Sequence, residues 1–409
     1  MAAITSDVEV EVRRPRRSVV IGVLLIVWVA AYFALRGIDT LVLGGQDTTG
    51  LHRWLTDHRD DIGQGNVFFA AIRIAVEHFV VLLQNVIAQP SFDRPVPVIG
   101  WLGVIAIAAY CAWAFGNWKV AVLTALGLGF VGLQGLWQES MDTLSLTVAA
   151  VLLSLLVAIP LGIWAGLSDR AFKVATLLLD LMQTLPTFVY LAPLTLFFAI
   201  GPAAATIATL IYAAPPAVRL TAHAIRSVPP ESVEAARSLG STGGQTLLKV
   251  LLPMSRSTVV VGINQTIMAA LSMVTVAALI DAPGLGQTVL KALQTLDVGV
   301  AFNAGLAIVV IAIVLDRVTT AAGDRPWRTA SVRRRVLLGA GAVAVLVAVW
   351  FSRTYVWAAD FPTGVNVGSR IAVIASDVTN WVQDVFGGFT YGVRDAVTVA
   401  LLNPLEGLL

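Results

Sequence analysis

Long apolar stretches dominate this chain and restrict it to the folds that a lipid bilayer allows. A membrane span needs about 20 mainly apolar residues, and the 409-residue chain holds many stretches of about that length. Only 13% of its residues are charged, whereas soluble domains carry roughly 25%. Because the bilayer core offers no water to backbone polar groups, isolated apolar segments must form helices. We therefore expect an all-α, polytopic membrane protein built as a helical bundle.

Hydropathy predicts about nine spans. They lie at residues 19–36, 97–115, 119–137, 142–166, 174–200, 202–218, 258–280, 299–316 and 336–352. A further apolar segment, residues 66–88, carries Arg73, Glu77 and His78 near its middle. We interpret it as a helix lying in the outer membrane interface, with a further span as the alternative.

A polar stretch between two predicted spans, residues 229–253, has a distinctive pattern. Pro229 and Pro230 open a helical run in which Glu234 is followed by the small residues Ala235 and Ala236. Carboxylates are favoured near a helix start, and small side chains let a helix approach another surface closely. Gly240 then releases the chain from the helix, and Pro253 suits the first turn of the next one. The pattern predicts a short helix, a bend, and a second helix continuous with a span.

The same residues resemble the EAA loop of ABC importer permeases. The family pattern is Glu-Ala-Ala, three residues, Gly, nine residues and Ile-x-Leu-Pro, and only Val250 departs from it. The resemblance implies that Glu234, Ala235, Ala236, Gly240 and Pro253 form a cytoplasmic coupling helix and its lever. It also implies cytoplasmic ABC ATPase subunits, which would bind ATP and Mg in place of this chain, and a second permease copy or paralogue.

A cytoplasmic coupling loop fixes every other loop by alternation. The inner side then holds most of the 27 Lys and Arg residues, which agrees with the positive-inside rule. We expect a multi-pass protein of a prokaryotic cell (inner) membrane, in contact with lipid, with a cytoplasmic N-terminus and an extracytoplasmic C-terminus.

The resemblance extends over residues 141–318 and is to the glycine betaine/proline group of these permeases. It is carried by Gln183–Tyr190, Leu271–Gly286 and Leu296–Arg317. It implies a five-span core, transport of a compatible solute such as glycine betaine, choline or a proline-like zwitterion, and delivery by an extracytoplasmic binding protein. The family usually has glycine where Asp281 stands.

Polar residues in the predicted core spans, together with one proline among them, are candidates for a translocation path, since polar groups in a bilayer must face protein or water. These candidates are Gln183, Thr184, Pro186, Thr187, Tyr190, Ser272 and Thr275. Pro186 and Pro193 can break their span, and the ring of Tyr190 could meet a quaternary ammonium. The alternative is ordinary hydrogen bonding between helices or to the residue's own backbone.

Other function classes find little support. The chain has no GxxxxGK[ST] phosphate loop, so we expect a permease and not an enzyme. Its four histidines have no metal-ligand spacing, and we expect no catalytic, cofactor-binding or metal site and no nucleic-acid partner. An ion-coupled carrier or channel is the main alternative, although the spans are nearly free of charge. A lipid-sensing or osmoregulated platform is a third.

We divide the chain into three regions. Residues 1–140 would hold an anchor span, the outer amphipathic segment and two accessory spans, and residues 141–318 the permease core. Residues 319–409 would hold a basic linker, one span and an outer amphipathic tail. The order of features in this last region repeats that of the N-terminus, so it is either the start of a second permease copy or an added anchor.

Overall fold

The computed structural model of the chain describes residues 22, 25–30, 58, 63, 65–90, 96–323, 332–362 and 366–402. The chain forms two compact units, residues 1–59 and 60–409. In the first unit residues 22 and 25–30 are helical. Most of the predicted span 19–36, and the basic residues Arg13 to Arg17, lie outside the described residues.

Every regular element described in the second unit is a helix. The N-terminal helices are α4 (Val67–Ile87), α5 (Trp101–Phe115) and α6 (Trp118–Leu133). The central helices are α7 (Trp137–Leu167), α8 (Asp169–Thr184), η1 (Thr187–Val189), α9 (Leu191–Phe198), α10 (Pro202–Arg226), α11 (Pro230–Ser238), α12 (Gly243–Thr246), η2 (Leu247–Leu251), α13 (Leu252–Ser272), α14 (Val274–Ala277), η3 (Ala278–Ile280), α15 (Leu285–Gln294) and α16 (Val298–Gly323). The C-terminal helices are α17 (Val332–Thr354), α18 (Val356–Ala359), α19 (Val367–Val397) and η4 (Thr398–Leu402).

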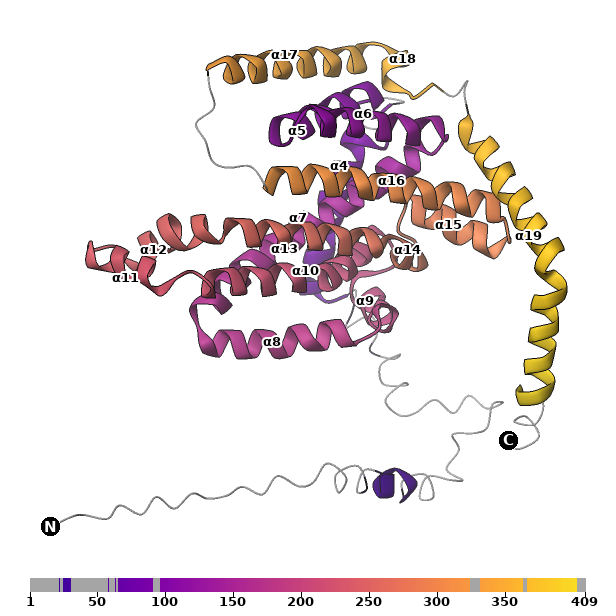
Figure 1. Cartoon of the computed structure of the whole chain (residues 1–409), viewed down its shortest axis with the longest axis horizontal. Coiled ribbons are helices and arrows are strands. Elements are labelled where there is room, and N and C mark those ends of the chain that lie inside the picture. Colours follow the sequence, from indigo (N-terminus) through magenta and orange to yellow (C-terminus); the bar gives the residue numbers. More distant parts are fainter. Residues whose placement is uncertain are drawn as a thin grey trace. The chain divides into compact units, whose positions relative to one another are not determined.

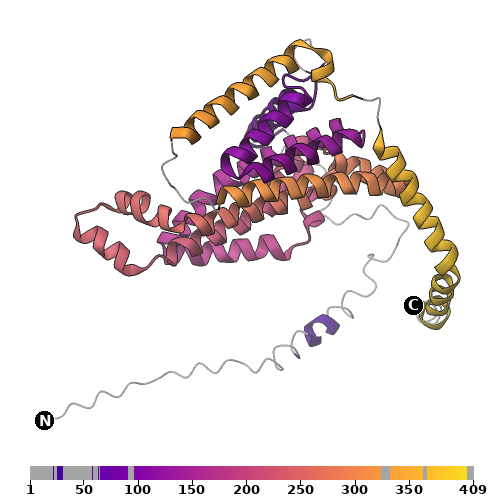
Figure 2. The same ribbon diagram turned by 45° about the horizontal axis from the view of Figure 1, so that its top comes forward.

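These helices pack as successive neighbours. α17 packs on α5, α5 on α6, and both α5 and α6 on α16. α16 packs on α13, α13 on α10, and α10 on α7 and α8. Figure 1 shows α17, α5, α16, α13, α10 and α8 running in similar directions, with α11 and α12 at one end of the bundle and α18 at the other. Figure 2 shows the same projection of α11 and α12 beyond the helices that carry them.

Small residues make the contact between α7 and α10, which is the most extensive one between described helices. The buried face of α10 is rich in alanine. A Cβ added to Gly162 of α7 would lie 2.6 Å from the Cβ of Thr221 and 2.9 Å from the carbonyl oxygen of Val218. Such approach is how helices associate in a membrane, where close packing replaces the hydrophobic effect.

The predicted span 174–200 is broken. α8 ends at Thr184, and the two halves of the segment meet at 94°. Leu185 is extended, with φ −73° and ψ 131°, because the ring of Pro186 disfavours helical geometry in the residue before it. α8 also carries Asp169, Lys173 and Asp180, which makes it amphipathic.

The number of span-length helices differs from the predicted nine. Among the described residues, six helices are long and apolar enough to cross a membrane, or seven if the bent pair counts as one span. The predicted spans 97–115 and 119–137 form helices of only 15 and 16 residues. Gly116 and Asn117 lie between them, and the Asn117 side chain caps the second. The first helix starts only after Gly100, and the second ends at Leu133, before the corner in which Gly135 has φ +75°.

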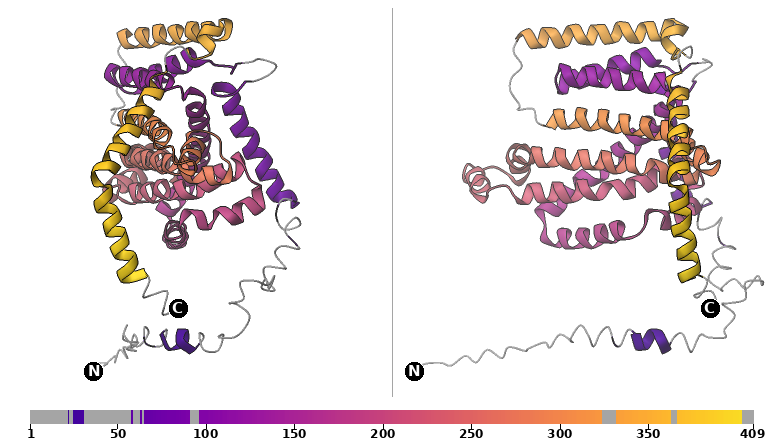
Figure 3. Two further views of the ribbon diagram at one scale, coloured as in Figure 1. Left: turned by 90° about the vertical axis from the view of Figure 1, so that its right-hand side faces the viewer. Right: turned by 45° about the vertical axis from the view of Figure 1, so that its right-hand side comes forward.

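α4 corresponds to the ambiguous segment 66–88. It packs on α7, α9 and α10, and Val80 is fully buried. The amides of Gln84 and Gln89 donate to the buried carboxylate of Asp142 on α7, at 3.3 and 3.0 Å. By length and composition α4 qualifies as a span, yet Figure 3 shows it inclined across the core helices, as a helix in the interface would be. Its interfacial position stays a prediction.

α19 is the amphipathic tail that was expected at the C-terminus. It contacts α16 through its first turns, where Gly299 lies against Ala372 and Ser376. Figure 3 shows it running across the direction of the core helices. Its later residues, from Trp381 onward, are almost all exposed.

Candidate coupling loop and translocation face

α11 is a short helix with a well-defined end. It begins after Pro229, carries Glu231 in its first turn and ends at Ser238. The N–H of Gly240 donates to the carbonyl of Arg237 at 2.9 Å, and that of Ser241 to the carbonyl of Ala236 at 3.1 Å. These two bonds form a Schellman motif. The φ of Gly240 is +78°, a left-handed conformation that favours glycine at the end of a helix.

The surface of α11 is open to a partner. Glu234 and Ala235 are exposed, while Ala236 is buried against the rest of the loop. Leu239, at the C-cap, is 88% exposed, and Leu248 in the next turn is also exposed. Sequence reasoning missed these two leucines; an apolar residue directly before the Gly240 turn was the signal that pointed to one of them.

The second half of the loop continues into a span. Thr242 and Gln245 form a capping box that starts α12. The chain then makes a π turn, Leu247–Leu251, before α13, with Pro253 in the first turn of α13. Proline lacks an N–H and its ring clashes with the carbonyl four residues earlier, which a locally wider turn relieves. Residues 243–272 therefore form one helical path from the loop into the bundle.

The base of the loop is fastened to the bundle. The hydroxyl of Ser255 on α13 donates to the carbonyl of Ala224 on α10 at 3.0 Å. Arg226, at the end of α10, pairs with Asp169 of α8 and lies 4.5 Å from the ring centre of Phe172. Among the helices that the structure describes, α11 makes its main contacts with α12 and η2. A force on α11 would thus reach the bundle through α10 and α13.

The path candidates fall into two groups. Gln183, Thr184 and Pro186 are exposed at the break after α8, and Ser272 and Thr275 are exposed at the end of α13 and in α14. The hydroxyls of Thr184 and Ser272 donate to carbonyls of their own helices, at 3.2 and 2.7 Å. Those hydroxyls are therefore satisfied without a path.

Thr187 and Tyr190 are only partly exposed. The ring of Tyr190 packs against a buried cluster that includes Leu191, Leu194 and Met273. Its hydroxyl is buried and finds no hydrogen-bond partner among the described residues. The ring of Tyr190, which was expected to meet a cation, is thus partly buried by packing in the core.

An exposed stripe runs the length of α13 and into α14. Its members recur every three or four residues: Met254, Ser257, Val261, Gln265, Met268, Ser272, Thr275 and Leu279. Gln265 was not singled out from the sequence, although it stands one heptad before Ser272. The amides of Gln183 and Gln265 make no hydrogen bond within the described part of the chain. Because an amide in a span must face water or protein, this stripe is a candidate path or permease–permease face.

Asp281 adopts a backbone conformation that favours glycine. It ends η3 in the left-handed conformation, with φ +61°, which glycine adopts freely and aspartate tolerates. Its carboxylate accepts a hydrogen bond from the amide of Gln287. The conformation explains the glycine of the family pattern, and the side-chain bond helps to hold aspartate in its place.

No group of His, Cys, Asp and Glu residues able to hold a metal ion occurs among the described residues. The polar side chains gathered at the loop and along α13 provide contacts and hydrogen bonds. The loop is arranged as a helix that could transmit movement to the bundle, and the α13 stripe is arranged as a face along which a solute could pass.

Comparison with known proteins agrees with the resemblance to importer permeases. The family model described as "Binding-protein-dependent transport system inner membrane component" matches residues 158–326. The glycine betaine/proline betaine transport system permease protein ProW of Escherichia coli (strain K12) is 40% identical over 68% of this chain and 76% of its own length. The glycine betaine transport system permease protein OpuAB of Bacillus subtilis (strain 168) is 44% identical over 52% of this chain and 76% of its own.

The glycine betaine/carnitine transport permease protein GbuB of Listeria monocytogenes serotype 1/2a (strain 10403S) is 40% identical over 67% of this chain and 95% of its own length. The resemblance predicted from residues 141–318 is confirmed. The chain belongs to the family of binding-protein-dependent transport system inner membrane components.

Proposed function

We propose that this chain is the transmembrane permease subunit of an ATP-driven ABC importer for a compatible solute of the glycine betaine, choline or proline type. Its relatives at 40–44% identity are permeases named for glycine betaine. The observation that carries the proposal is the projecting helix α11, whose glycine-closed end stands at the position of the family's coupling loop.

The ATPase partner would dock on the exposed face of α11. Glu234 and Ala235 lie on that face, and Leu239 and Leu248 offer apolar anchors beside it. Docking of a short helix in a groove is a common recognition mode. ATP-driven approach of two ATPase subunits would pull two such helices together, and α10 and α13 would carry the movement into the bundle.

The exposed stripe of α13 suits a path for a zwitterion. From Ser257 to Leu279 it offers one amide, three hydroxyls and one thioether but no charged residue. A solute with balanced charges would pass such a face without tight binding, and selective capture would belong to an extracytoplasmic binding protein. A second copy of the chain, or a paralogue, would complete the path on the other side.

Glu234→Lys tests the docking. We expect weaker co-purification of the ATPase subunit, because the substitution reverses a charge at the contact face. The permease should still purify as a monodisperse protein, since Glu234 is exposed. Asp384→Lys, on the exposed part of α19, is the matched control and should leave co-purification unchanged. Wild-type recovery of the ATPase with Glu234→Lys would refute the docking assignment.

Accessibility of the termini tests the proposed orientation. We expect a tag after Leu409 to be labelled from outside intact cells and a tag before Arg13 to be labelled only after permeabilisation. Labelling of both tags from the same side would mean that the number of spans is even, with 66–88 as the first segment to reassign.

A further inference from the structure

A cavity of about 540 Å³ lies at the end of the bundle opposite α11 and α12. One wall is the corner between α6 and α7, from Gly132 to Gln138, and the other is made by residues of 356–362 around α18 together with Asn366. Small-molecule sites in proteins occupy roughly 300–1,000 Å³, so the cavity is large enough for a small organic ligand. It is separate from the α13 stripe described above.

The aromatic wall of the cavity is held in place by packing. The ring of Phe361 stacks on Trp137 at 5.4 Å between centroids, and Trp101 meets Phe361 edge-on at 5.0 Å between centroids. The indole N–H of Trp101 also donates to the carbonyl of Trp357 at 3.0 Å. These contacts fix the segment that carries Trp357 to the start of α5, so the rings do not depend on a ligand for their positions.

Two glycines make room for this wall. A Cβ on Gly132 would overlap the ring of Phe361. Gly135 has φ +75°, and a Cβ there would lie 2.9 Å from the amide nitrogen of Asn366. The corner between α6 and α7 is thus shaped to receive the C-terminal segment.

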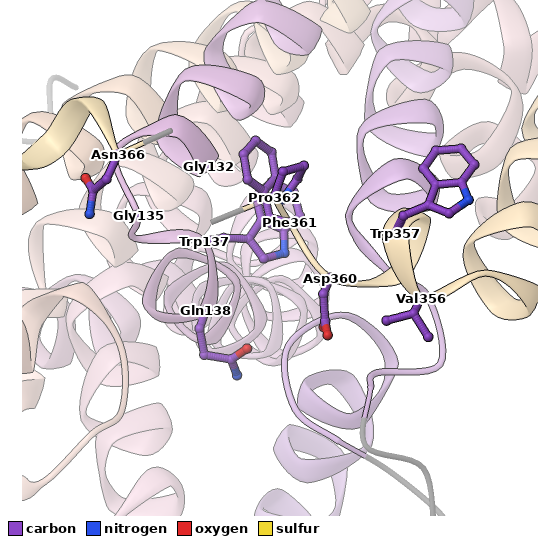
Figure 4. A pocket seen from close by; sticks show the side chains of 10 residues that line it. All are labelled: Gly132, Gly135, Trp137, Gln138, Val356, Trp357, Asp360, Phe361, Pro362 and Asn366. Carbon is purple, nitrogen blue, oxygen red and sulfur yellow. The ribbon is translucent and has the colours of Figure 1, made fainter. Parts of the chain in front are cut away.

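The charge of the cavity is negative. Figure 4 shows the carboxylate of Asp360 at its edge, near the amide of Gln138, with Trp137 and Phe361 on one side and Trp357 on the other. Asp360 is exposed, and its carboxylate makes no hydrogen bond or ion pair among the described residues. Among the described residues that line the cavity, none is Lys, Arg or His.

We propose that this cavity binds a small organic cation of the alkylammonium class. Aromatic faces attract cations, and tryptophan attracts them best; an unpaired carboxylate supplies the opposite charge. A zwitterion such as glycine betaine brings its own carboxylate close to Asp360 and should bind more weakly than choline. The cavity is therefore a site distinct from the cargo path, and an occupant would join the C-terminal segment to the start of α7.

Direct binding of choline to the purified full-length chain in nanodiscs tests the proposal. Tetramethylammonium serves as a second probe, glycine betaine as the zwitterion, and sodium chloride as the ionic-strength control. We expect saturable choline binding in the millimolar range, competition by tetramethylammonium, and at least several-fold weaker binding of glycine betaine. Asp360→Asn and Trp357→Leu should each weaken choline binding several-fold, because each removes one attractive contact.

The controls are Asp384→Asn and Trp381→Leu, which make the same changes on the exposed part of α19. Absence of saturable binding to the wild type, unchanged affinity in Asp360→Asn, or equal affinity for glycine betaine would overturn the proposal. The proposed function enters this inference at one point only: it places the cavity at the extracytoplasmic end of the bundle. A failure of the cavity proposal can be told apart from a failure of the proposed function, because Glu234→Lys tests docking of the ATPase and leaves the cavity intact.

Discussion

α10 takes part in two regions with opposite properties. Its alanine-rich face is buried in the seam with α7, where glycines such as Gly162 let the helices approach closely. Its C-terminal end leads into the coupling loop, where Gly240 has no atom of another residue near the position of a Cβ. The seam uses glycine for space, and the loop uses it for a positive φ. We infer that the seam determines the stability of the bundle, whereas the loop determines contact with a partner.

The largest effect on stability should come from Gly162→Ala in the seam. The added methyl would press on Thr221 and on the backbone of Val218, and overpacking of this kind typically costs about 1–3 kcal/mol. We expect a clear fall in thermal stability of the purified protein. Gly305→Ala in α16 is the matched control, because no atom lies within 4 Å of its Cβ position. If both substitutions lowered the thermal stability equally, the inference that the seam determines the stability of the bundle would be wrong.

Asp281 should give a smaller effect and test the backbone argument. In Asp281→Ala the residue keeps a positive φ and loses its bond with Gln287, so we expect a loss of about 1–2 kcal/mol. Asp281→Gly loses the same bond but relieves the backbone, and it should be close to neutral. Thermal unfolding of the two variants, measured side by side, separates the contribution of the side-chain hydrogen bond from that of the backbone conformation. If both lose the same stability, the side-chain bond outweighs the left-handed conformation.

Much of the coupling loop could be predicted from the sequence, because it depends on residues that are close together in the chain. The coupling loop depends on residues within about one helix length of each other, so its pattern specified α11, the Gly240 turn and the helix containing Pro253. The break at Pro186 likewise follows from the preference of one dipeptide. The remaining predicted spans that the structure describes are helical. The two accessory helices are shorter than predicted, because the first starts only after Gly100 and the second ends at Leu133.

The rest depends on contacts between distant residues. Gln265 lies in an apolar stretch, and only the packing of α13 on α10 and α16 determines which of its faces remains exposed. The cavity brings Trp137 together with Phe361, which no local pattern indicates. The docking of α4 was missed for the same reason: its amides meet Asp142, more than 50 residues away in the chain. The prediction of a second permease copy at 319–409 is not tested by the fold.

The most direct test of the coupling role is uptake per ATP hydrolysed in a Gly240→Leu variant. The permease would be reconstituted with its ATPase subunit and binding protein, and both quantities would be measured in the same vesicles. A leucine at φ +78° costs roughly 1–2 kcal/mol of backbone strain, which is too little to unfold the bundle and enough to tilt α11. We predict normal expression, continued ATP hydrolysis and a lower ratio of uptake to hydrolysis. An unchanged ratio would contradict the account and require another pivot between the ATPase and the bundle.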